Sequence, residues 1–155
     1  MGNLNQKGAQ LMASSGLNIL IDTGFWIALY NPEREPLRSA LADEYADLIE
    51  DQNIIVPYPS LYEFVNSRLS RAEAKHAFKS FIGRPNVKKV SDTKYNETAL
   101  DRFFSKAIGG WTDVSLVDEI LILMLEDTSL RIDYIASFDQ GLINQAASLR
   151  VHLVK

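Results

Sequence analysis

Cysteine is absent from this sequence, and only two of its 155 residues are histidines, His76 and His152. The lack of cysteine excludes thiolate catalysis, cysteine zinc sites and disulfide bonds. Two isolated histidines do not make a histidine-rich metal centre, so we expect His76 on the surface and a structural role for His152. Long apolar runs are also missing, since none approaches the ~20 residues that span a bilayer. The first residues lack the apolar region of a signal peptide. We therefore expect a soluble, cytoplasmic protein that does not enter a membrane.

Positive charge is in the minority, with 16 basic against 20 acidic residues and a net charge of −4. This balance argues mildly against a protein that coats nucleic acid. The charges are nevertheless unevenly distributed. Residues 31–53 hold seven acids and two bases, net −5, whereas residues 66–94 hold eight bases and two acids, net +6. Within the basic stretch Arg68, Arg71, Lys75 and Lys79 follow helical spacing, which predicts either an RNA-binding surface or a solvated helix face.

The length fits one domain. Residues 1–16 are small and polar without sustained periodicity, so we expect a mobile N-terminal extension followed by a single domain over residues 17–155. Apolar runs at residues 18–21, 54–56, 87–90, 134–137 and 151–154 are typical of strands. Helical patterns occupy residues 24–30, 37–50, 60–69, 71–82, 93–108, 115–127 and 142–149. Strands that alternate with helices predict an α/β fold with a parallel sheet, and the lysines in the run at 87–90 place that strand toward an edge.

Four acidic residues lie at joins between these predicted elements. Asp22 follows the first strand, Glu63 follows the second, Asp118 begins the helix at 115–127, and Asp139 follows the fourth strand. Because the carboxyl ends of parallel strands share one edge of a sheet, we expect these carboxylates to crowd a single cleft. Like charges at close range need a strong cation, and hard divalent ions such as Mg²⁺ or Mn²⁺ select oxygen ligands.

Each of these acids also fits a local structural role. Ser60 and Glu63, like Ser115 and Asp118, have the spacing of a capping box. Asp22 and Asp139 could cap helices or shape turns after their strands. Asp113 is an alternative to Asp118, although it precedes the predicted helix and should be more solvated. The neighbouring Glu119 should point elsewhere on the helix. Aromatic residues that could stack on bases are more typical of a core or an interface; they are Phe25, Trp26, Phe103, Phe104 and Trp111.

Taken in order, the four acidic segments resemble the PIN-domain family, which includes the VapC ribonuclease toxins of toxin–antitoxin systems. The segments are Ile21-Asp22-Thr23, Pro59-Ser60-Leu61-Tyr62-Glu63, Ser115-Leu116-Val117-Asp118 and Ser137-Phe138-Asp139. The resemblance covers about residues 18–154 and implies a PIN-like α/β/α sandwich with a central, mostly parallel sheet of about five strands. It departs from the family's common pattern at Ser137, at Gly24 and after Asp139, which leaves the number of metal ions open.

The resemblance implies a metal-dependent endoribonuclease, with Asp22, Glu63, Asp118 and Asp139 as catalytic ligands of Mg²⁺, or alternatively Mn²⁺. Such an ion lowers the pKa of a bound water, and the hydroxide attacks an RNA phosphodiester bond. Thr23 and Ser137 match hydroxyl positions that orient these carboxylates, and Asn66 lies one helical turn after Glu63. The implied partners are an RNA substrate, a cognate antitoxin protein and a second copy of the chain in a homodimer.

Two other functions are compatible with parts of this pattern. A PIN-like scaffold could bind RNA or protein without cleaving, although such a scaffold has no physical reason to keep four clustered carboxylates. A phosphohydrolase of the haloacid-dehalogenase type would need a second aspartate two residues after Asp22, where this chain has Gly24. The sequence therefore favours the nuclease.

Overall fold

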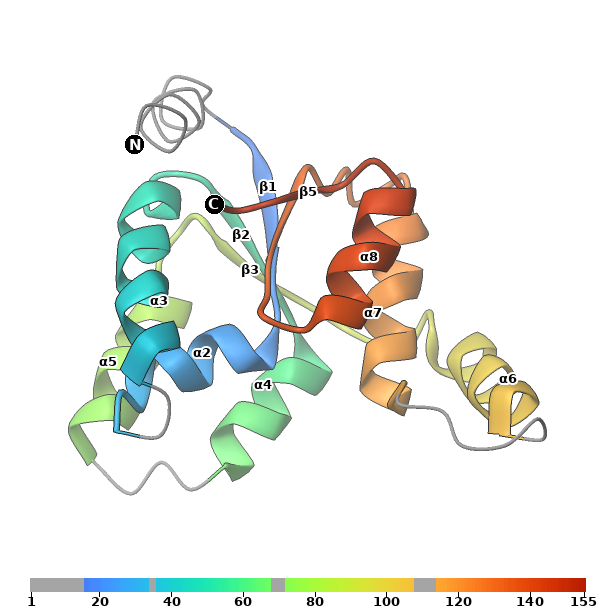
Figure 1. Ribbon diagram of the computed structural model, residues 1–155, viewed down its shortest axis with the longest axis horizontal. Coiled ribbons are helices and arrows are strands. Elements are labelled where there is room, and N and C mark those ends of the chain that lie inside the picture. The colour runs from blue at the N-terminus through green and yellow to red at the C-terminus, as the bar shows by residue number, and fades with distance from the viewer. Residues whose placement is uncertain (1–15, 34–35, 68–71, 108–113) are drawn as a thin grey trace.

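The protein forms a layered α/β structure, which a computed structural model describes for residues 16–33, 36–67, 72–107 and 114–155 (Figure 1). The strands are β1 (Asn18–Ile21), β2 (Asn53–Pro57), β3 (Val87–Val90), β4 (Tyr134–Ala136) and β5 (His152–Leu153). The helices are α2 (Thr23–Tyr30), α3 (Pro36–Ile49), α4 (Tyr58–Asn66), α5 (Ala72–Ile82), α6 (Asn96–Ala107), α7 (Leu116–Glu126) and α8 (Gln140–Ser148). These bounds lie within a few residues of the predicted ones. Apart from Gly16, the predicted N-terminal extension lies outside the described residues.

The five strands form one parallel sheet in the order β3-β2-β1-β4-β5. β3 is an edge strand, as its two lysines predicted, and both lysine side chains are exposed. After β1 the chain builds the sheet outward through β2 and β3, and it then returns to the opposite side of β1 to form β4. The carboxyl ends of β1 and β4 therefore flank a topological switch point, where open α/β sheets bind their ligands.

Alternate residues of the central strand point into two separate cores, one on each face of the sheet. Ile19 and Ile21 belong to the core that α2, α3, α4 and α5 cover, whereas Leu20 belongs to the core beneath α6, α7 and α8. In Figure 1 the first group of helices lies on one side of the sheet and the second group on the other. This three-layer arrangement confirms the α/β/α sandwich and its parallel sheet of five strands.

An aromatic cluster holds the helices of the first layer together. Trp26 of α2 is fully buried, and its ring lies 6.4 Å from that of Phe64 on α4 and 5.3 Å from that of Phe78 on α5. The Phe64 and Phe78 ring centroids are only 4.3 Å apart. Such contacts each add about 1 kcal/mol beyond the burial of their area. They pack α4 against α2 and so help to position Glu63, the residue before Phe64.

Of the aromatics expected in a core or an interface, Phe25 and Trp26 lie in the core, Phe103 is half-buried and Phe104 is 60% exposed. Trp111 lies outside the described residues. Within the described ranges, no helix combines the length and the apolar composition that crossing a bilayer requires.

Candidate active site

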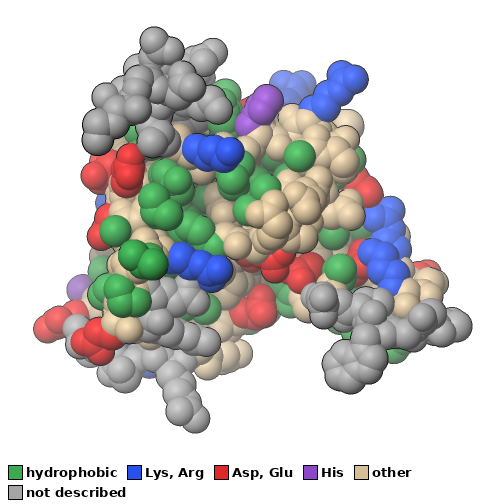
Figure 2. All heavy atoms as spheres, in the orientation of Figure 1, with side chains coloured by type: hydrophobic (Ala, Val, Ile, Leu, Met, Phe, Trp, Pro, Cys, Tyr) green, Lys and Arg blue, Asp and Glu red, His purple; other side chains and the backbone are tan. Residues whose placement is uncertain are grey.

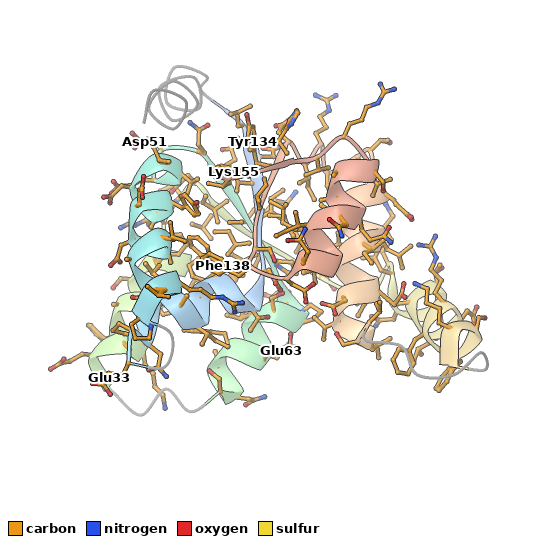
Figure 3. The ribbon with its side chains drawn as sticks, viewed as in Figure 1. Glu33, Asp51, Glu63, Tyr134, Phe138 and Lys155 are labelled. Atoms are coloured by element: carbon orange, nitrogen blue, oxygen red, sulfur yellow. The ribbon has the colours of Figure 1, made fainter. Side chains whose placement is uncertain are left out.

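The four predicted acids line one cleft at the carboxyl edge of the sheet. The cleft has a volume of about 470 Å³, and its walls are formed by Asp22, Thr23, Gly24, Arg38, Glu63, Ser115, Asp118, Phe138, Asp139 and Gln140. Figure 2 shows acidic side chains gathered around a hollow near the middle of this face, and Figure 3 shows Glu63 on α4 and Phe138 directly after β4 at the same edge. The acids come from both helical layers, so only the folded sheet brings them together.

Asp22 is the most buried of the four, with 8% of its surface exposed. It follows β1 directly and caps α2, because its Oδ1 accepts a hydrogen bond of 2.8 Å from the Thr23 amide. Its Oδ2 accepts a second bond of 2.9 Å from the Ser137 hydroxyl. Burial raises the pKa of Asp22 from 3.8 to about 6, against the lowering effect of both hydrogen bonds, and the charges of Asp118 and Asp139 raise it further.

Glu63 differs from the other acids because it does not cap a helix. α4 begins at Tyr58 with a proline in its first turn, two residues before the predicted start. The predicted Ser60–Glu63 capping box is therefore wrong. Instead, the Glu63 Oε1 accepts a hydrogen bond of 3.0 Å from the Thr23 hydroxyl. Glu63 remains exposed, but partial desolvation raises its pKa. The Thr23 hydrogen bond lowers this pKa, and the nearby negative charge of Asp118 raises it.

Asp118 both caps a helix and lines the cleft. The Ser115 hydroxyl accepts a bond of 3.1 Å from the Asp118 amide, and the Asp118 Oδ2 accepts one of 3.2 Å from the Ser115 amide. This reciprocal pair confirms the predicted capping box at α7. Burial raises the pKa of Asp118, its Ser115 bonds lower it, and the charges of Asp139 and Glu119 raise it. The alternative ligand, Asp113, lies outside the described residues.

Asp139 caps α8, since its Oδ1 accepts a hydrogen bond of 3.0 Å from the Leu142 amide. The Asp139 amide in turn donates to the Ser137 hydroxyl at 3.0 Å. Ser137 thus links the backbone at Asp139 to the carboxylate of Asp22. A Cβ atom at Gly141 would lie 3.2 Å from the Asp139 Oδ1, so a larger residue there would crowd this carboxylate.

Several predicted site residues lie away from the cleft. Asn66 is exposed at the end of α4 and is not part of the cleft wall. Lys75 and Lys79 are exposed on α5, beside a separate apolar recess. Arg68 and Arg71 lie outside the described residues. Glu119 does point elsewhere, as expected, because its buried carboxylate pairs with Lys106 of α6.

Sequence reasoning missed Arg38, which belongs to α3 and lines the cleft together with the four acids. Its guanidinium carbon is 5.6 Å from the centre of the Phe138 ring. No sequence pattern indicated it, because Arg38 belongs to the strongly acidic stretch of residues 31–53 and reaches the cleft only because α3 packs against α2.

The donors in this cleft fit a hard divalent cation, because every carboxylate and hydroxyl offers oxygen. Among the described residues no three acidic or histidine side chains stand close enough to share one ion directly. Mg²⁺ and similar ions are commonly held by one or two carboxylates with bound waters and substrate phosphates completing the shell. The oxygen donors of this cleft would therefore suit Mg²⁺ or Mn²⁺ with water or substrate completing the shell.

Comparison with known proteins gives a match at the level of fold. No protein-family model matches the chain, and no curated protein does. Among solved structures the chain is similar to VapC20 of Mycobacterium tuberculosis, a sarcin–ricin loop cleaving toxin, with a TM-score of 0.63 and 18% sequence identity over 80% of this chain and 92% of that chain. At this identity the similarity concerns the fold alone. The chain thus has an α/β/α fold similar to that of VapC20.

Proposed function

We propose that this chain is a metal-dependent endoribonuclease that hydrolyses RNA phosphodiester bonds. The observation that carries the proposal is the acidic cleft. Carboxylates at the starts of α2, α7 and α8 and one within α4 line it, and it lies at the topological switch point of the sheet. The similarity of the fold to that of VapC20 supports RNA as the substrate.

In this proposal the side chains of the cleft hold and orient a cation. A Mg²⁺ or Mn²⁺ ion bound here would supply an activated water and stabilise charge on the reacting phosphate. Asp22 and Glu63 would contribute ligands whose oxygens are oriented by Ser137 and Thr23, at 2.9 and 3.0 Å. Without a cation, the raised pKa of Asp22, about 6, makes this carboxylate easier to protonate than an ordinary aspartate. A divalent ion and this proton would therefore compete for the same carboxylate.

We further propose that the protein is the toxin of a toxin–antitoxin pair. Its similarity to VapC20 supports a protein antitoxin as partner. A homodimer and a cytoplasmic location remain predictions from the family resemblance.

One observation favours a second function, that of a scaffold which binds RNA or protein without cleaving it. Asp22, Asp118 and Asp139 each cap a helix, so their presence has a structural explanation that needs no metal. Glu63 has no such role, which makes it the residue that best separates the two functions.

Cleavage of a mixed tRNA and rRNA pool in Mg²⁺, in Mn²⁺ and in EDTA tests the proposal. We expect the wild type to cut only with metal, and Asp22→Asn and Glu63→Gln to lose this activity. Glu44→Gln is the matched control, because Glu44 is exposed on α3 outside the cleft wall. If folded protein, shown to carry no bound inhibitor, cuts nothing under any of these conditions, the scaffold becomes the better description.

A further inference from the structure

Arg38 places a positive charge in a cleft that is otherwise acidic. Among the described residues of the cleft wall it is the only lysine or arginine, and four acidic residues line the same cleft. An RNA strand that approaches this cleft brings further negative charge. A divalent ion would offset repulsion at the reacting phosphate, but the rest of the strand would still meet acidic walls. A cation fixed in the wall is therefore well suited to receive the strand.

One contact of Arg38 is with a stack of two aromatic rings. The Phe138 ring is stacked on the buried Phe25 ring, with centroids 6.2 Å apart and planes inclined by 12°. The Arg38 guanidinium lies over the same Phe138 ring at 5.6 Å, within the range of a cation–π contact. Phe138 stands between Ser137 and Asp139, so the loop between β4 and α8 carries two residues of the acidic network and also the ring that contacts the arginine. Figure 3 shows Phe138 in this loop.

From this geometry we infer that Arg38 is a substrate-binding residue that takes a backbone phosphate of the RNA at the Phe138 wall of the cleft. The planar guanidinium can donate two parallel hydrogen bonds to the non-bridging oxygens of a phosphate. The exposed position of Arg38 leaves it accessible from solvent, and the Phe138 ring limits where the guanidinium can lie. Phe138 is a positioning residue in this arrangement. The inference rests on the proposed function, because it takes RNA as the ligand.

Binding of a labelled single-stranded RNA oligonucleotide to the full chain in EDTA tests this role without cleavage. Dissociation constants are measured at several salt concentrations for the wild type, Arg38→Gln, Arg38→Lys and Phe138→Leu. Arg131→Gln is the matched control, because it removes the same charge from an exposed arginine just before β4, at the amino edge of the sheet.

We expect Arg38→Gln to weaken binding about 10-fold at low salt, the usual effect of one lost charge-assisted phosphate contact. The slope of log Kd against log salt should fall by about 0.7, the value for one phosphate of a single strand. Arg38→Lys should keep most of the slope but lose part of the affinity, since lysine cannot bind bidentately. Phe138→Leu should weaken binding by roughly 3-fold through loss of the cation–π contact. Arg131→Gln should bind like the wild type.

Two results would overturn the inference while leaving the proposed function intact. One is an equal effect of Arg38→Gln and Arg131→Gln on RNA affinity and salt slope, in protein that still cleaves RNA with metal. The other is a lower melting temperature of Arg38→Gln with unchanged binding, which would make Arg38 an internal counter-ion of the acids. A wild type that neither binds nor cleaves RNA would overturn both proposals.

Discussion

Replacing Asp22 by asparagine should stabilise the metal-free protein at neutral pH. Burial and the neighbouring acids raise the pKa of this carboxyl from 3.8 to about 6. The folded protein therefore holds a proton on Asp22 at pH values where the unfolded chain has already released it. The contribution of this proton to the free energy of unfolding is fully present below about pH 4 and is lost as the pH rises through 6. At pH 7 the folded state must carry an ionised carboxylate that is 8% exposed.

The magnitude follows from the two pKa values. At about 1.4 kcal/mol per pH unit, keeping Asp22 ionised in the folded state costs about 3 kcal/mol at pH 7. Asparagine avoids this cost, and its side-chain oxygen can still accept the hydrogen bond from the Thr23 amide. Its amide nitrogen, however, cannot accept the hydrogen bond that the Ser137 hydroxyl donates to Asp22. The imperfect bond costs about 1 kcal/mol. A net gain of about 2 kcal/mol remains, which for a chain of this size raises the melting temperature by roughly 4 to 8 °C.

Thermal unfolding in EDTA at several pH values measures this effect. The advantage of Asp22→Asn should be largest at pH 7, should shrink as the pH is lowered and should be gone by about pH 3, where Asp22 is protonated in both states. Asp101→Asn is the control, because Asp101 is exposed on α6 and its replacement should change the melting temperature little. If Asp22→Asn lowers the melting temperature at pH 7, or if its effect does not depend on pH, the argument from a desolvated, crowded carboxylate is wrong.

Three further perturbations have defined outcomes. Glu63→Gln should leave the melting temperature within about 2 °C of the wild-type value. It should reduce metal-dependent RNA cleavage by at least about 100-fold, because loss of a metal ligand should cost at least as much activity as loss of a residue that only orients a ligand. Unchanged cleavage would remove Glu63 from the site. Ser137→Ala should weaken Mn²⁺ binding, followed by calorimetry, by roughly 10- to 100-fold, because Asp22 loses an orienting hydrogen bond. Equal Mn²⁺ affinities in wild type and variant would contradict that role. Lys106→Met should destabilise the protein in urea by about 2 kcal/mol, because it leaves the Glu119 carboxylate buried and unpaired, and the double variant with Glu119→Leu should recover most of this loss. Failure of the double variant to recover would mean that packing, not the ion pair, sets the cost.

The sequence predicted the fold well because its local signals and its packing agree. The apolar runs of β1, β2 and β4 are buried on both faces, as strands of a parallel sheet require. The edge position of β3 followed from its two lysines. The start of α4 was misplaced because Ser60 resembled a cap, whereas Pro59 fits the first helical turn and lets the helix begin at Tyr58.

The candidate site was only partly predictable. Asp22, Asp118 and Asp139 follow strands or begin helices, and connectivity alone predicts that such positions gather at one edge. Arg38 escaped prediction because its place depends on how α3 packs on α2, which short sequence patterns do not encode. The same limit applies to Lys75 and Lys79, whose helical spacing was correct but whose helix lies away from the cleft wall.

Because the acids also cap helices, the fold and the proposed chemistry can be lost independently of each other. Asparagine caps a helix about as well as aspartate does, so an amide at Asp22 or Asp139 would preserve the start of α2 or α8 while removing a negative charge. If the proposed nuclease activity holds, a single change of this kind would remove it while the protein remained folded. Among related proteins, a preserved fold would then say little about activity, and the residue at the position of Glu63, which caps no helix, would be more informative.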